Sequence, residues 1–182
     1  MEIREFLALV VPFIIVIYIG FLLFIRPTRP ALRASLLGGL VMGLINALID
    51  LVAYYAGWWY YNLNGLTLHL PLPFYITPLL VYGSIVYLLI WRFWTGRGRW
   101  FALFLLFSVP IFCIVRDTLG GISSSSYAVW KSPLATPVTI VMWLVAFYGG
   151  FLLFQRLAPP RPEVNWEVVK PERDEAMKAE QE

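Results

Sequence analysis

Five long apolar segments constrain the fold of this chain more than any other feature of its sequence. Each is close to the roughly 20 residues that an α-helix needs to cross the hydrocarbon core of a bilayer. We predict transmembrane helices over residues 6–25, 36–56, 74–94, 100–119 and 134–157. The first should be retained as a helix, because no basic leader or small-residue cleavage site accompanies it. The sequence therefore predicts an all-α, multi-pass membrane bundle.

Charged residues are sparse and unevenly distributed along the chain. They make up 14% of the residues, whereas soluble domains carry about a quarter. Between Glu5 and Glu163, the acidic residues are Asp50 and Asp117 alone. The net charge of +3 arises from arginines in loops, so we interpret it as a sign of membrane orientation and expect no nucleic-acid-binding surface.

Arginines mark one side of the predicted bundle. They lie in the first and third connections and after the fifth segment: Arg26, Arg29, Arg33, Arg92, Arg97, Arg99, Arg156 and Arg161. The other two connections, residues 57–73 and 120–133, contain only Lys131 and His69 as basic residues. Because cytoplasmic loops are enriched in Lys and Arg, we predict a cell-membrane protein with its N-terminus outside and its C-terminus in the cytoplasm.

Residues 158–182 differ in composition from the rest of the chain. The segment begins with a proline-rich stretch and continues with mixed charges and few apolar side chains. Such a composition cannot bury enough apolar surface to form a core. We therefore predict a transmembrane domain over residues 1–157 and a charged, partly disordered cytoplasmic tail, with a partner-docking segment as the alternative.

One face of the second segment carries small and polar side chains. Residues spaced by three or four positions share a helix face, and here they are Gly39, Gly43, Asn46, Asp50 and Tyr54. Small residues four apart let helix backbones approach closely in lipid. We expect this face to pack against protein, within the chain or in a homo- or hetero-oligomer, with Asn46 forming an interhelical hydrogen bond.

The unusual titratable residues are predicted at one end of the bundle. An ionisable residue inside a transmembrane segment marks a functional site or a buried pair, which makes Asp50 the first candidate. Asp117 ends the fourth segment, and His69 lies in the outer loop. Adjacent helical residues point apart, so Arg116 is expected to reach Asp50 more readily than Asp117. If that pair forms, Asp50 is structural. If it does not, Asp50 is a candidate catalytic proton donor, assisted by Asp117 or His69.

An aromatic cluster follows the second segment: Trp58, Trp59, Tyr60 and Tyr61. Tryptophan and tyrosine concentrate at membrane interfaces, so the cluster can be an interfacial belt. Electron-rich rings around an apolar cavity also stabilise cations through their π faces. With Asn46 and Tyr54, these rings are therefore candidate substrate-binding residues.

The chain offers little for metal or cofactor binding. Cys113 is its one cysteine and His69 its one histidine, which excludes an internal disulfide and any cluster built on Cys or His. A metal would need Asp50, Asp117 and His69 together, and their spacing does not indicate such a site. We predict neither a metal nor a cofactor.

Residues 50–89 read DLVAYYAGWWYYNLNGLTLHLPLPFYITPLLVYGSIVYLL. This stretch resembles the small membrane domain of the heterodimeric or tandem lycopene cyclases of carotenoid biosynthesis. The positions that match the pattern are Asp50, Trp58, Trp59, Gly65, Pro71 and Leu72. That family carries a glutamate pair after Leu-Pro-Leu, where this chain has Pro73 and Phe74. The resemblance thus implies shared handling of an isoprenoid more than identical chemistry.

Two functional hypotheses follow. The first is a membrane-embedded isoprenoid- or carotenoid-handling protein that binds an apolar lipid or polyene, such as a lycopene-cyclase-like, proton-initiated cyclase, which is an isomerase. Asp50 would be its acid. The second is a non-catalytic accessory or assembly subunit of a larger membrane complex, favoured by the missing glutamate pair, the small size and the charged tail.

Overall fold

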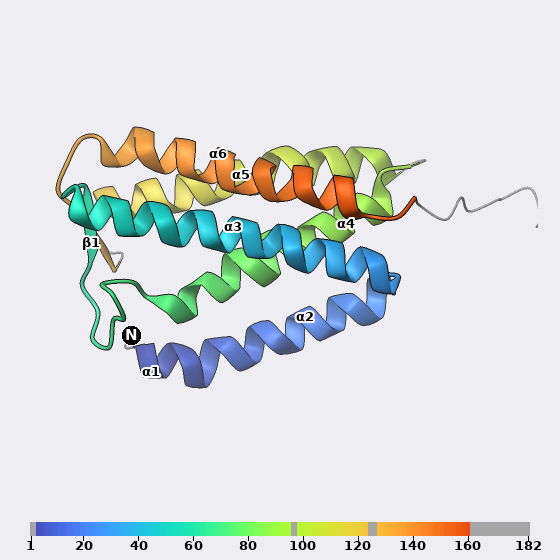
Figure 1. Ribbon diagram of the computed structural model, residues 1–182, viewed down its shortest axis with the longest axis horizontal. Helices are drawn as coiled ribbons and strands as arrows, with labels where there is room; N and C mark the ends of the chain where they lie inside the picture. Colours follow the sequence, from blue (N-terminus) through green and yellow to red (C-terminus); the bar gives the residue numbers. More distant parts are fainter. Residues whose placement is uncertain (1–2, 96–97, 124–126, 161–182) are drawn as a thin grey trace, which may run out of the picture.

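Five long helices run side by side, and a small two-stranded ribbon joins two loops at one end, in the computed structural model shown in Figure 1. The structure describes residues 3–95, 98–123 and 127–160. The described residues are 78% helical, and five of their helices are long and apolar enough to cross a membrane. The prediction of an all-α fold with five helices of membrane-spanning length is confirmed. Most of the predicted tail lies outside the described residues, from position 161 onward.

Apart from the start of α3, each span begins and ends close to a predicted boundary. Several contain tight or wide helical turns, labelled η. In chain order the elements are α1 (Ile3–Glu5), η1 (Phe6–Val10) and α2 (Val11–Ile25) in the first span; α3 (Arg29–Tyr55) in the second; η2 (Leu72–Tyr75), η3 (Thr77–Ile85) and α4 (Val86–Phe93) in the third; α5 (Arg99–Ile122) in the fourth; and α6 (Ala135–Leu157) in the fifth.

The start of α3 differs most from the prediction, because the helix begins at Arg29 instead of residue 36. The chain leaves α2 through Arg26, which has a left-handed backbone (φ 48°). Thr28 then caps α3, its Oγ1 accepting from the backbone nitrogen of Ala31 at 3.4 Å, and Pro30 lies in the first turn, where a missing N–H costs nothing. Hydropathy cannot detect this polar first turn.

Glycines allow α3 to pack tightly between two other helices. A Cβ atom on Gly38 would lie 2.6 Å from the carbonyl oxygen of Gly150 in α6, and one on Gly83 of η3 would lie 2.6 Å from the Cα of Gly39. A Cβ on Gly43 would also face η3. The Gly39/Gly43 face therefore packs against the η2–η3 segment of the same chain, and a contact with another chain through this face stays a prediction.

A buried hydroxyl cluster links the first three spans. The Oγ of Ser84 in η3 lies 2.8 Å from the Oγ of Ser35 in α3 and 3.0 Å from the hydroxyl of Tyr18 in α2. Ser35 also donates to the carbonyl oxygen of Leu32 at 2.8 Å. Because Ser35 and Ser84 are fully buried, these bonds help to hold the helices in register.

The ribbon is a feature that the prediction of an all-helical protein did not include. Strand β1 (Trp59–Tyr61) pairs antiparallel with β2 (Ala128–Trp130), with Trp59 opposite Trp130. The chain turns from α3 toward β1 at Gly57, whose φ of 70° favours glycine. The ribbon closes the end of the bundle opposite the connections that carry the arginines (Figure 1).

Candidate functional site

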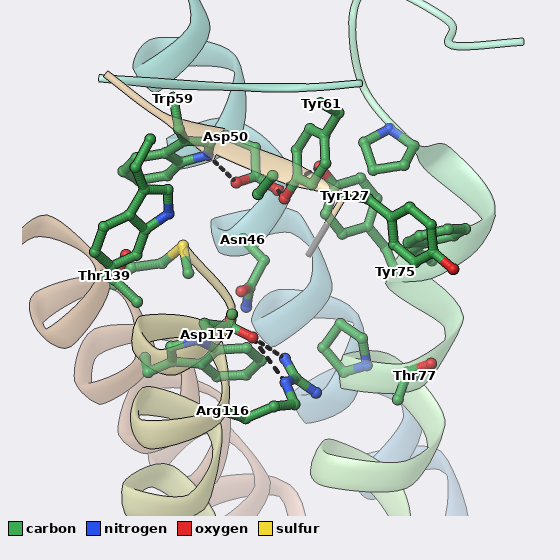
Figure 2. Close-up of a pocket in the computed structure, with 18 of the residues that line it drawn as sticks. Asn46, Asp50, Trp59, Tyr61, Tyr75, Thr77, Arg116, Asp117, Tyr127 and Thr139 are labelled. Carbon is green, nitrogen blue, oxygen red and sulfur yellow. Dashed lines mark hydrogen bonds and ion pairs between the residues drawn. The ribbon is translucent and has the colours of Figure 1, made fainter. Parts of the chain in front are cut away.

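A cavity of about 470 Å³ lies beneath the ribbon, at the level of the last turns of α3 (Figure 2). Its volume is within the range of small-molecule binding sites. Residues from all five spans and both strands line it. Most of the lining side chains are apolar or aromatic, including Phe6, Trp59, Tyr61, Phe74, Tyr75, Tyr127, Trp130, Met142 and Trp143.

Asp50 is the buried acid of this cavity, with 5% of its surface exposed. Its Oδ1 accepts from Trp59 Nε1 at 3.0 Å, and its Oδ2 accepts from the hydroxyls of Tyr61 at 2.9 Å and Tyr75 at 2.7 Å. An indole N–H can only donate, whereas a phenol can donate or accept. These aromatic groups therefore replace water around the carboxylate, and the two tyrosines could accommodate a change in its protonation.

Strand geometry divides the predicted aromatic cluster into two sets. Successive side chains on a strand point to opposite faces, so Trp59 and Tyr61 face the cavity. The ring of Tyr60 instead lies 4.6 Å from the Nζ of Lys131, and Trp58 packs with Trp59 beside Ala135. Trp58 and Tyr60 are not among the residues that line the cavity. Of the four rings in the cluster, the structure thus brings Trp59 and Tyr61 to the cavity.

The hydroxyl of Tyr61 is suited to remain a hydrogen-bond donor to Asp50. Tyr61 ends strand β1, outside the spans. Its removal from water raises the pKa of its phenol well above the ordinary value, and the negative charge of Asp50 adds to the shift. The phenol therefore keeps its proton at neutral pH.

Tyr75 is the site residue that the sequence analysis missed. It comes from η2, the tight turn that begins beside Pro71 and contains Pro73. The sequence does place a tyrosine at the start of the third span, at the level of Asp50 near the end of the second. This position does not show which way the side chain points, because the orientation of η2 about its axis depends on how η2 packs.

Arg116 does not pair with Asp50, which was the alternative that would have made Asp50 a structural residue. Arg116 instead pairs with Asp117, with Nη2 and Nε lying 2.6 Å and 2.7 Å from Asp117 Oδ1. Although their Cβ atoms diverge, the long arginine side chain can curl along the helix surface to its neighbour. Asp50 and the Arg116–Asp117 pair lie on opposite sides of the cavity, with Asn46 between them (Figure 2).

The Arg116–Asp117 pair connects three helices. Arg116 Nη1 donates to the hydroxyl of Tyr82 in η3 at 2.8 Å, and Trp143 Nε1 in α6 donates to Asp117 Oδ2 at 2.7 Å. The guanidinium carbon lies 5.4 Å from the ring centre of Tyr82 and 5.5 Å from that of Trp143. These distances are within the range of cation–π attraction.

Replacing Trp143 with phenylalanine should destabilise the bundle by about 1 kcal/mol, since interhelical hydrogen bonds in membranes contribute about 0.6 kcal/mol on average and up to about 1.7. The variant keeps a ring near Arg116 and removes the donor to Asp117. Unfolding in mixed micelles measures the change. Trp100→Phe is the control, because Trp100 is 81% exposed. Equal stabilities for the two variants would contradict this role of the indole.

The remaining predicted residues are placed differently from expectation. Asn46 lines the cavity, but its Nδ2 donates to the carbonyl oxygen of Met42 in its own helix at 2.8 Å, so the expected interhelical bond is wrong. Tyr54 and His69 lie outside the cavity lining, with their rings stacked at 4.0 Å. His69 is exposed, and the structure does not bring it to Asp50.

Neither a metal site in the described residues nor a match to a known protein helps to identify the function. Within residues 3–95, 98–123 and 127–160, no group of three or more His, Cys, Asp or Glu side chains could hold a metal ion. No protein-family model, curated protein or solved structure matches the chain. The function must therefore be inferred from the chemistry of the cavity.

Proposed function

We propose that the cavity binds one end of an isoprenoid or polyene chain and that Asp50 exchanges a proton with it. The observation that carries this proposal is a buried carboxylate among aromatic rings in an otherwise largely apolar cavity. Arg116 neutralises Asp117. Of the charged side chains that line the cavity in the described part of the chain, Asp50 is thus the one without an ionic partner.

The proposed chemistry needs no cofactor. Protonated Asp50 would give its proton to one carbon of a carbon–carbon double bond, which leaves a carbocation on the other carbon. Attack by a second double bond would close a ring, and loss of a proton from a neighbouring carbon to Asp50 would restore the acid and give an isomer. The rings of Trp59, Tyr61 and Tyr75 would stabilise the cation through their π faces.

The resemblance to lycopene cyclases supports the ligand class but requires different acid–base chemistry. In the position of one family glutamate, Phe74 lines the cavity and packs on Phe6 with ring centres 4.2 Å apart. A single carboxylate would then both give and take the proton. By the positive-inside rule, the end of the bundle that carries the arginines would face the cytoplasm. The cavity lies at the opposite end, so it would be near the outer face of the cell membrane.

Co-purification tests the proposal directly. The full chain, purified in mild detergent from a host that makes polyenes, should retain a polyene or isoprenoid that is detected by absorbance and mass spectrometry. A preparation with no such ligand and with a stoichiometric partner chain would instead favour an accessory subunit.

Tyr75→Phe should slow product formation about 10–100-fold, because a hydrogen bond to a charged group contributes about 1.5–3 kcal/mol. The variant removes the shortest of the bonds to Asp50 and keeps the ring. Product is measured by chromatography after incubation with a linear polyene in vesicles. Tyr54→Phe is the control, since Tyr54 stacks on His69 outside the cavity. Equal rates for the two variants would remove Tyr75 from the mechanism.

A further inference from the structure

A second hollow lies on the other side of η2 from the cavity. This groove has a volume of about 510 Å³ and is formed between the first span, α3 and the η2–η3 segment. Its walls include Leu7, Leu40, Gly43, Leu44, Ala47 and Leu79, and none of the described residues that line it is charged. Every lining residue belongs to a membrane-spanning segment. Hydrocarbon is therefore the matching occupant.

The groove and the cavity share a wall. Tyr75 lines both, with its hydroxyl directed to Asp50. The same elements supply the two sides: α3 presents Asn46 to the cavity and Ala47 to the groove, while η2 presents Phe74 to the cavity and Leu72 to the groove. One thin segment of chain thus separates an open apolar groove from the buried acid.

Ligand length connects the two hollows. The cavity has the volume of a drug-sized site, whereas a polyene long enough to span a bilayer extends over about 30 Å. Such a chain cannot fit into the cavity, so most of it must lie elsewhere. We propose that the groove holds the chain of an isoprenoid or polyene whose end enters the Asp50 cavity past Tyr75. This inference rests on the proposed function.

Gly43 determines how much room the groove has. A Cβ atom at this position would meet Leu79 Cβ and the Tyr75 carbonyl oxygen at 3.7 Å each, which are ordinary contacts. A leucine there can be accommodated by the backbone, and its remaining atoms would extend into the groove. Gly20 provides a matched control, because it is exposed on α2 and a Cβ there would meet nothing within 4 Å.

Photo-crosslinking of the full chain in phosphatidylcholine vesicles tests the proposal. Two probes are used, geranylgeraniol with a diazirine at its hydrocarbon end and geranylgeraniol with a diazirine midway along its chain, and mass spectrometry locates the labelled residues. We expect the first probe to label the cavity, at residues such as Phe74, and the second to label the groove around Gly43. Gly43→Leu should lower both by about tenfold, whereas Gly20→Leu should leave both unchanged. Undiminished labelling in Gly43→Leu would overturn the proposal.

Competition distinguishes a specific isoprenoid chain from ordinary lipid. An excess of unlabelled geranylgeraniol should abolish labelling, and the same concentration of oleyl alcohol should not. Equal competition by the two alcohols would overturn the proposal, because the groove would then be a general lipid contact.

The proposed function can fail separately. Asp50→Asn changes the chemistry and not the volume of the cavity, so labelling at both places should persist while product formation is lost. If Asp50→Asn kept full product formation, Asp50 would not be the residue that transfers the proton. The labelling results would still show whether the groove holds the chain.

Discussion

Asp50→Asn is expected to abolish product formation while the bundle remains folded. The amide has nearly the same shape as the carboxylate, and its oxygen can still accept the indole hydrogen of Trp59. Its NH₂ group can donate to the hydroxyls of Tyr61 or Tyr75, which can act as acceptors. The amide has no acidic proton to give at neutral pH, so the loss is one of chemistry. Chromatographic measurement of cyclised product, beside a thermal melt in detergent, separates activity from folding.

A second substitution at the same position separates the structural role of the acid from its chemical role. Asp50→Leu leaves three donors without their acceptor, and each buried group left unsatisfied costs about 1–3 kcal/mol. We therefore expect Asp50→Leu to be markedly less stable than Asp50→Asn. Full activity in Asp50→Asn would show that Asp50 is structural and that the proposed acid lies elsewhere.

Gly39→Ala is expected to destabilise the bundle by about 3 kcal/mol, at the upper end of the usual cost of overpacking. The added Cβ would overlap the carbonyl oxygen of Leu79 and lie 3.2 Å from the backbone nitrogen of Ser84. Backbone atoms cannot rotate away as a flexible side chain can. Relief would need α3 and η3 to separate, which would also strain the nearby Ser35–Ser84 hydrogen bond. Reversible unfolding in mixed micelles measures the change.

Gly43→Ala is the matched control for this prediction. It makes the same change one helical turn later on the same face, where the added Cβ has only ordinary contacts at 3.7 Å. Its stability should be close to that of the unmodified chain, or slightly higher because alanine restricts the unfolded backbone. If the two alanine variants were equally stable, the close approach of α3 and η3 would be wrong.

Hydropathy could predict the spans because helices in lipid follow runs of apolar residues with little dependence on tertiary contacts. It failed where polar residues extend a helix, as at Arg29, whose turn is set by the Thr28 cap and Pro30. It also missed the ribbon, since the pairing of Trp59 with Trp130 joins loops far apart in the sequence. Such pairing depends on α6, which follows β2 in the chain, packing against α3.

The candidate site was predictable in its centre and not in its surroundings. Asp50 stands out because an acid in an apolar span is rare. Its partners Trp59 and Tyr61 were among the candidate rings, but the prediction could not separate them from Trp58 and Tyr60 without knowing that this stretch is a strand. Tyr75 lies 25 positions away in the chain from Asp50, and only the packing of η2 against α3 brings its hydroxyl to the acid.

The sequence by itself determined the class of the protein: a bundle of five apolar helices, with arginines in alternate connections and one acid near the end of the second span. These properties follow from local composition, because burial in lipid is decided segment by segment. The tertiary structure decided which partner each charge takes. Arg116 was free, by spacing, to reach either acid, and its orientation between Tyr82 and Trp143 places it on Asp117. Asp50 therefore accepts hydrogen bonds from Trp59, Tyr61 and Tyr75. Side-chain pairing of this kind depends on distances between helices, which the sequence of one segment does not determine.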